Sequence, residues 1–163
     1  MTSNNSFITN LRKRGQIAQI SHEEELEQLL KKGNQNEKGE RYSVYCGFDP
    51  TAASLHVGNL AALMMLRRAQ DVGLQPIVLF GGATGLIGDP TGRTEMRPMN
   101  TKEQIVSYIE NFKLLVNRYF RFDVPNPPIF VNNMDWIGNM SWIDFSRDVG
   151  SHFTVARLLS AEV

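Results

Sequence analysis

The most informative part of this chain reads Tyr45-Cys46-Gly47-Phe48-Asp49-Pro50-Thr51-Ala52-Ala53-Ser54-Leu55-His56-Val57-Gly58-Asn59. Its first part belongs to an apolar, β-prone run over 42–48, which predicts a strand. Asp49-Pro50-Thr51 ends that strand, because proline fixes φ and has no N–H for a sheet ladder. Ser54 is a candidate cap for a helix that begins near Leu55 or His56. The stretch therefore predicts a strand, a tight turn and the start of a helix.

His56, Gly58 and Asn59 fall in the first turn of that predicted helix. The N–H groups there have no partner within the helix, and the helix dipole adds positive charge. A strand that leads into such a turn is a common anion-binding arrangement. Gly58 has no Cβ, so a flat ligand can lie close to the backbone. We therefore expect a ligand site at the end of the first strand.

A second strand is predicted at 77–80, which is continuously apolar, as strands of parallel sheets are. The helix that joins the two strands is apolar nearly all round over 60–66, so we expect it to be buried against the sheet. Its return to solvent is marked by Arg67, Arg68, Gln70 and Asp71, and Gly73 caps it. A strand, a helix and a strand at this spacing are typical of a right-handed βαβ unit. The fold class is therefore α/β with a parallel sheet.

Further elements extend this sheet. A capping pattern at Asn100–Glu103 begins a helix that is predicted to reach about Phe120. Ile129–Asn133 is predicted to be a third parallel strand, and helices are predicted at 142–149 and 154–162.

Residues 1–41 are predicted to form a helical appendage and a linker in front of the sheet domain, which occupies 42–163. One helix covers Ser6–Arg14 and ends at Gly15. A second follows the capping-box pattern Ser21–Glu24 and is closed by Gly33.

The segment 81–93 holds five glycines in thirteen residues, so its backbone turns tightly or approaches another group closely. It is neither a Walker loop nor a dinucleotide fingerprint, because the lysine and the glycine spacing are missing. A purely structural loop is one interpretation. Its place at the carboxyl end of a parallel strand favours a ligand site instead.

The totals describe an ordinary globular chain of 163 residues with 42% apolar and 21% charged residues. The 17 basic residues balance the 17 acidic ones, so no overall field attracts nucleic acid. Cys46 is the single cysteine, which excludes an internal disulfide and favours a reducing compartment. We expect no membrane span and no secretory signal, because no apolar run is long enough. Basic residues at 12–14 suggest a mitochondrial presequence, but glutamates follow closely, so the cytoplasm is favoured.

The motif His56-Val57-Gly58-Asn59 resembles the nucleotide signature of class I aminoacyl-tRNA synthetases. The preceding Tyr45–Thr51 is more narrowly similar to the tyrosyl-tRNA synthetases. The similarity extends from about Phe7 to the end and includes 81–97 and 133–138. It implies the N-terminal part of a Rossmann-like catalytic domain, a doubly wound parallel sheet that is truncated here. The family joins tyrosine to ATP, releases pyrophosphate and transfers the tyrosyl group to tRNA(Tyr).

For tyrosine, the resemblance implies three binding residues. Tyr45 matches the residue whose hydroxyl bonds the substrate phenol, a contact that discriminates against phenylalanine. Asp89 matches the carboxylate that pairs with the α-ammonium group, and Thr84 matches a neighbour of the same substrate. The alternative for Tyr45 is a core tyrosine of the strand.

For ATP, the resemblance implies the residues Cys46, Gly47, Asp49, Thr51, His56, Gly58 and Asn59. Cys46 matches a thiol that contacts the ribose, and Asp49 matches a carboxylate at the adenylate site. Thr51 and His56 match the pair that bonds the γ-phosphate as the α-phosphorus becomes five-coordinate. Asn59 replaces the more usual histidine and still has an amide that donates to the ribose. Three of these residues also have a structural alternative: a small buried side chain for Cys46, a turn former for Asp49 and a surface histidine at a helix terminus for His56.

Arg93 and Arg97 match basic residues of a mobile loop that closes over the departing pyrophosphate, and a solvated loop is the alternative. Asn133 and Trp136 resemble residues that support the tyrosine pocket from behind. The resemblance further implies Mg²⁺ on the phosphates without a metal site of the protein, and a homodimer. The family's second signature loop, second half-sheet and anticodon-binding domain do not occur before Val163, so we expect a longer native product and little activity of this part alone.

Two other functions remain open. Tryptophan activation is supported mainly by Asn59, because tryptophanyl-tRNA synthetases often carry asparagine at that position. A catalytically inactive synthetase-like module that binds RNA or protein is the third possibility.

Overall fold

The computed structural model describes residues 6–54, 56–87 and 100–156. Three parallel strands form one sheet in the order β1-β2-β3: β1 (Ser43–Phe48), β2 (Gln75–Phe80) and β3 (Ile129–Asn132). Phe48 is level with Phe80, and Phe80 is level with Asn132, so the three strands end in one row. The predicted α/β class, the three strands and their parallel direction are confirmed.

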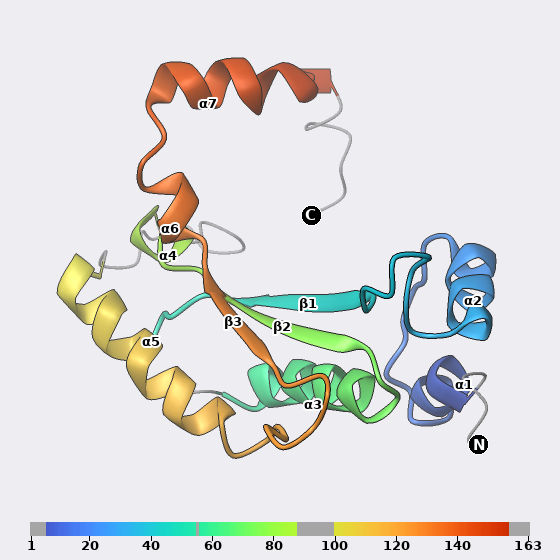
Figure 1. The fold of residues 1–163 in the computed structure, drawn as a ribbon. Coiled ribbons are helices and arrows are strands. Elements are labelled where there is room, and N and C mark those ends of the chain that lie inside the picture. Colours follow the sequence, from blue (N-terminus) through green and yellow to red (C-terminus); the bar gives the residue numbers. More distant parts are fainter. Residues whose placement is uncertain (1–5, 55, 88–99, 157–163) are drawn as a thin grey trace.

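Two long helices pack on one face of this sheet, as Figure 1 shows: α3 (Val57–Asp71) and α5 (Lys102–Val116). Alternate strand residues point at these helices and are buried, for example Phe48, Val78 and Phe80. The Phe80 ring lies 6.5 Å from that of Phe112 in α5 and 6.0 Å from that of Phe130 in β3, measured between centroids. These aromatic side chains pack in the core together with aliphatic residues of α3 and α5.

The opposite face of the sheet carries the other half of each strand. Tyr45 on β1 is 70% exposed, and Ile129 on β3 is exposed as well. Ile77 and Leu79 on β2 are only partly buried. Parallel sheets are usually covered on both faces, whereas the residues that the structure describes leave this apolar face partly exposed.

The helix starts differ from the sequence predictions at three places. The cap of α3 is His56 rather than Ser54, and α2 (Glu23–Lys32) has His22 at its N-cap without a side-chain hydrogen bond, so the predicted box at Ser21 is wrong. His22 has a left-handed backbone, while three glutamates in the first turn of α2 complement the helix dipole. Thr101 caps α5 and forms a reciprocal box with Gln104, so the predicted box is present but lies one residue later than the pattern Asn100–Glu103.

The ends of the helices are closer to expectation. Gly15, Gly33 and Gly73 all have positive φ just after α1, α2 and α3, as glycines that stop helices do. Helix α5 ends at Val116 rather than near Phe120, because the chain turns at 117–119. The helix predicted at 154–162 falls mostly outside the described residues, which show helical backbone at 155–156.

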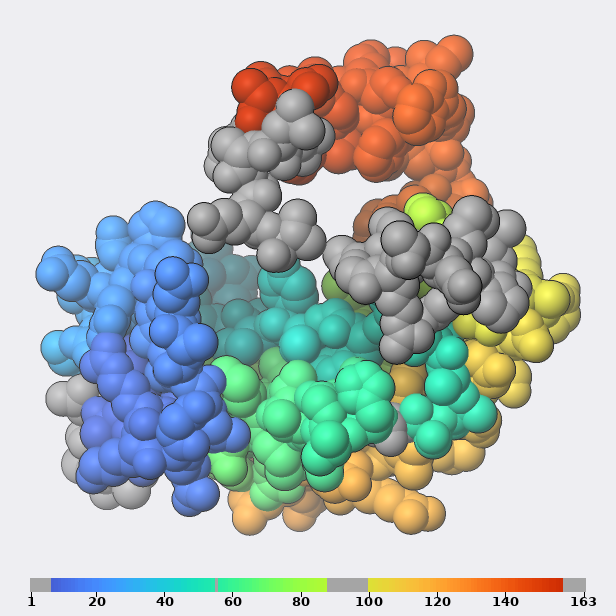
Figure 2. Space-filling view, turned by 180° about the vertical axis from the view of Figure 1, so that it is seen from behind, coloured from blue at the N-terminus to red at the C-terminus, as the bar shows by residue number. Residues whose placement is uncertain are grey.

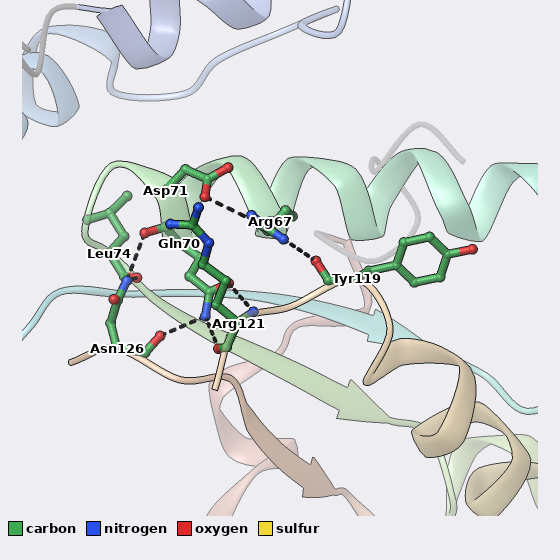
Figure 3. A network of polar contacts seen from close by, with 7 residues as sticks. All are labelled: Arg67, Gln70, Asp71, Leu74, Tyr119, Arg121 and Asn126. Carbon is green, nitrogen blue, oxygen red and sulfur yellow. Dashed lines mark hydrogen bonds and ion pairs between the residues drawn. The ribbon is translucent and has the colours of Figure 1, made fainter. Parts of the chain in front are cut away.

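A buried polar network ties the end of α3 to the loop before β3 (Figure 3). The Gln70 side chain donates to the carbonyl oxygens of Arg121 (2.7 Å) and Asn126 (3.0 Å) and accepts from the Arg121 N–H (3.0 Å). Asn126 in turn donates to the carbonyl oxygens of Gln70 (2.9 Å) and Leu74 (2.7 Å). The prediction that Gln70 marks the return of α3 to solvent is therefore wrong. Gln70 is only 4% exposed, and its hydrogen bonds explain how a polar side chain is accommodated there.

The N-terminal segment packs on the start of the sheet through α1 (Ser6–Lys13) and α2. Ile8 and Leu30 form a second buried cluster with Ala69 of α3 and Leu74. In Figure 2 this blue segment lies directly against the green part of the body. The predicted division into 1–41 and 42–163 stays a prediction.

Two short helices follow strands: α4 (Thr84–Ile87) lies between β2 and α5, and α6 (Met134–Ile137) follows β3. After α6 the chain forms α7 (Trp142–Asp148) and the 3-10 turn η1 (Gly150–His152). Figure 2 shows α7 and η1, in orange and red, standing clear of the blue and green body. Trp142 is 79% exposed and Ile143 is exposed too. Among the described helices, none is long and apolar enough to cross a membrane.

Candidate functional site

The site is built where the three strands end. Because Phe48, Phe80 and Asn132 are level, the residues that follow them emerge at one edge of the sheet. These residues are Asp49, the glycine pair Gly81-Gly82 and Asn133. The ladder continues past the strands, since the N–H of Gly81 donates to the Phe48 carbonyl and that of Asn133 to the Phe80 carbonyl, both at 3.0 Å. Carboxyl ends of parallel strands are the usual ligand-binding edge.

Asp49, Thr84 and Asn133 form a hydrogen-bonded chain across this edge. The Thr84 hydroxyl donates to Asp49 Oδ1 at 2.7 Å and accepts from Asn133 Nδ2 at 3.2 Å. Asn133 Oδ1 accepts the Ala83 N–H at 2.7 Å. Asn133 is 7% exposed, whereas Asp49 and Thr84 are exposed. A buried amide thus anchors two polar side chains that face solvent.

The glycine pair leaves space for this chain. A Cβ on Gly81 would lie 1.8 Å from Asp49 Oδ1, and a Cβ on Gly82 would lie 2.2 Å from Asn132 Oδ1. Asn132 Oδ1 accepts the N–H of Gly82 and that of Met134, both at 3.1 Å. The glycines of this loop therefore have a structural function, and the same contacts place the loop beside the carboxylate of Asp49. These contacts support the structural interpretation of the glycine-rich segment, and its role as a ligand site stays a prediction.

His56 caps α3 with its imidazole. Nδ1 accepts the N–H groups of Gly58 (3.1 Å) and Asn59 (3.3 Å), and Asn59 Oδ1 accepts the His56 N–H at 3.2 Å. Because Nδ1 is the acceptor, the proton of the neutral imidazole is on Nε2. Two of the N–H groups that we expected to be open to an anion are therefore paired with His56. The exposed imidazole offers one donor, Nε2–H, in their place.

Gly58 is small for a local reason. A Cβ there would lie 3.0 Å from Cε1 and 3.1 Å from Nδ1 of His56, which is tighter than ordinary contact. The expected role of Gly58, room for a flat ligand, stays a prediction. Thr51 is exposed in the turn after β1, and its N–H donates to the Asp49 carbonyl at 2.9 Å.

Tyr45 and Cys46 lie on opposite faces of β1. Tyr45 is on the open face, so the alternative of a core tyrosine is wrong for the described chain. Cys46 packs at the margin of the core, and burial raises the pKa of its thiol. Both residues line an apolar cavity of about 540 Å³ between the N-terminal segment and β1 with α3. The nearest atom to a Cβ on Gly47 would be Leu79 Cδ2 at 3.9 Å, so no close contact requires a glycine there.

Three predicted site residues lie outside the described residues: Asp89, Arg93 and Arg97. Within the described residues, no group of three or more His, Cys, Asp or Glu side chains is placed to hold a metal ion. Trp136 on α6 is exposed, while Asn133 is buried as a supporting residue would be. Sequence reasoning missed Asn132, although two consecutive asparagines at the end of a predicted strand are a usable signal. It also missed the reciprocal cap, which the three-residue spacing of His56 and Asn59 indicates.

The family model of the class I tRNA synthetases for W and Y matches residues 36–163. The chain belongs to this family. A tyrosine–tRNA ligase of Caldanaerobacter subterraneus subsp. tengcongensis is 48% identical over 157 residues, which are 96% of this chain and 37% of that protein. A tyrosine–tRNA ligase of Clostridium botulinum is 47% identical over 152 residues, 93% of this chain and 35% of that protein.

Solved structures of this synthetase family share the fold. A C-terminally truncated mitochondrial tyrosyl-tRNA synthetase of Aspergillus nidulans aligns with a TM-score of 0.76 at 25% identity, over 96% of this chain and 45% of that one. The corresponding structure from Coccidioides posadasii gives 0.70 at 25% identity, over 99% and 44% of the two chains. The chain thus spans little more than a third of the curated relatives that it matches. The expected Rossmann-like synthetase domain, truncated, is confirmed.

Proposed function

We propose that this chain is the first part of a tyrosine–tRNA ligase, which activates L-tyrosine with ATP and then transfers it to tRNA(Tyr). The observation that carries the proposal is the His56 cap at the carboxyl edge of the sheet. There, the exposed imidazole of His56 uses Nδ1 for the cap and keeps Nε2–H available as a donor. His56 follows Asp49 by seven positions and Thr51 by five in the sequence. The names of the relatives, tyrosine–tRNA ligases at 43–48% identity, support tyrosine as the amino acid.

In this proposal the chain positions ATP and stabilises charge, and no covalent enzyme intermediate forms. Thr51 and His56 donate to phosphate oxygens, and each charge-assisted hydrogen bond contributes about 1.5–3 kcal/mol. Asn59 uses Oδ1 for the cap, so its Nδ2 is the group that donates to the ribose. Cys46, Gly47 and Gly58 line the nucleotide side.

The remaining roles concern other groups. Tyr45 and Asp89 bind tyrosine, and the resemblance places Thr84 near the same substrate. Arg93 and Arg97 cover the departing pyrophosphate. Mg²⁺ is carried by the phosphates, where it neutralises charge that develops during phosphoryl chemistry. We further propose a cytoplasmic homodimer whose contacts with tRNA lie mainly beyond this chain.

Tryptophan activation is the second candidate, because the family model covers both amino acids and Asn59 replaces the usual histidine. An inactive synthetase-like module is the third candidate. The intact Thr51, His56 and Asp89 argue against it, since decay would free these positions to change.

Amino-acid-dependent ATP–pyrophosphate exchange on the full-length gene product, with all twenty amino acids, tests the proposal. We expect exchange with tyrosine alone, a reduction of about tenfold or more in His56→Ala, and no change in the matched control His152→Ala, an exposed histidine of η1. Exchange with tryptophan would favour the second candidate. If no amino acid supports exchange, the inactive synthetase-like module becomes the favoured candidate.

A further inference from the structure

We propose that Thr84 is a positioning residue that acts through Asp49 on the ATP side of the site. This inference rests on the proposed function and deepens it. The resemblance assigns Thr84 to the tyrosine side, whereas the hydroxyl is bonded to the carboxylate that the resemblance assigns to the adenylate.

The hydroxyl of Thr84 is committed by its neighbours. It has a single proton, and that proton goes to Asp49 Oδ1 at 2.7 Å. Its oxygen accepts from Asn133 Nδ2 at 3.2 Å. In this arrangement Thr84 has no proton left to donate to a substrate. Its contribution to ligand binding therefore passes through the group that it holds.

Asn133 fixes the other end of the chain. It is 93% buried, and its Oδ1 is taken by the Ala83 N–H, so its amide has one orientation in which Nδ2 faces Thr84. The Asn133 N–H continues the sheet ladder to the Phe80 carbonyl. The position of the Thr84 hydroxyl is thus fixed by a residue that is hydrogen-bonded to the sheet, and not by a loop.

Asp49 is confined from two sides. Its Oδ1 accepts the Thr84 hydroxyl, and a Cβ on Gly81 would lie only 1.8 Å from the same oxygen. Its Oδ2 has no hydrogen-bond partner in the part of the chain that the structure describes. A carboxylate held by one oxygen presents the other in a fixed direction. Preorganising an acceptor in this way lowers the cost of ordering it when the ligand binds.

The test distinguishes an effect of Thr84 on ATP from an effect on tyrosine. In the full-length protein, Thr84→Val removes the hydroxyl at nearly constant volume, and Thr84→Ser keeps it. Thr9→Val makes the same chemical change at an exposed residue of α1. We expect Thr84→Val to raise the KM for ATP in pyrophosphate exchange about tenfold, which is the loss of one charge-assisted hydrogen bond. The KM for tyrosine changes less than about twofold. Serine restores the KM for ATP, and Thr9→Val has no effect.

A double-mutant cycle tests whether Thr84 acts through Asp49. In an Asp49→Asn background, Thr84→Val has little further effect on the KM for ATP, because the acceptor through which it acts has lost its charge. Independent, multiplying effects would overturn the proposal. A rise in the KM for tyrosine alone, an equal rise in both KM values, or no change in either would also overturn it.

Equilibrium dialysis of ATP provides a readout that does not need turnover. If the wild-type protein exchanges pyrophosphate with no amino acid, the proposed function fails. In that case the inference is supported if Thr84→Val weakens ATP binding and Thr84→Ser does not, and any other result overturns it. A wild-type protein that binds no ATP would overturn it.

Discussion

Gln70 is the residue whose replacement tests the buried polar network most directly. Gln70→Met keeps the length and helix propensity of the side chain and removes its three hydrogen bonds. The loop at 119–126, which those bonds fasten to α3, is the segment that we expect to loosen (Figure 3).

The magnitude follows from what is left unpaired. Each lost hydrogen bond costs about 1 kcal/mol net, and a buried group without a partner costs about 1–3 kcal/mol. Arg121 is exposed, so water can replace the partner of its backbone groups, whereas Asn126 is buried and its carbonyl cannot be compensated easily. We therefore expect a loss of about 2–4 kcal/mol in the free energy of local opening, which is about 30- to 700-fold in the opening equilibrium.

Native-state hydrogen exchange of the full-length protein measures this opening in peptides that cover 117–127. The Arg121 amide is the direct reporter, since it donates to Gln70 Oε1 at 3.0 Å. Gln28→Met is the matched control, because Gln28 is exposed on α2 and forms no hydrogen bond through its side chain within the described residues. Acceleration of less than about threefold in Gln70→Met would refute the reasoning and assign the stability of this loop to apolar packing alone.

The other predictions concern the site. His56→Asn keeps an N-cap acceptor but removes the imidazole donor, so we expect pyrophosphate exchange to fall about 10- to 150-fold at unchanged helix content by circular dichroism. A fall in helix content would instead show that only the imidazole can cap α3. Gly81→Ala places a methyl group 1.8 Å from Asp49 Oδ1, so exchange should drop at least about tenfold, while Gly150→Ala, whose Cβ meets nothing closer than 3.8 Å, should match the wild type. Equal activity of the two variants would contradict the close contact. Burial raises the pKa of the Cys46 thiol, which leaves less thiolate near neutral pH, so alkylation by iodoacetamide should be slower than for N-acetylcysteine and its pH midpoint should be higher. An equal or faster rate would show that the thiol is not buried in solution.

Local patterns determined most of the fold from the sequence. The apolar runs at 42–48, 77–80 and 129–133 became the strands β1, β2 and β3, because they are short, rich in β-prone side chains and bounded by turn residues. Gly15, Gly33 and Gly73 ended helices, since each adopts a positive φ that other residues rarely adopt. The family resemblance was also local, because fifteen consecutive residues carried its densest part.

Tertiary structure alone determined which polar residues are buried and what they bond. Gln70 looked like a surface residue because nothing in a helix sequence reveals that a distant loop will supply its partners, 51 and 56 positions away. The chain from Asp49 through Thr84 to Asn133 joins residues 35 and 49 positions apart. Sequence could name each of its members as a site residue but could not connect them. Their connection depends on the register that sets Phe48, Phe80 and Asn132 level, and a one-residue slip in that register would point the following side chains to the opposite face.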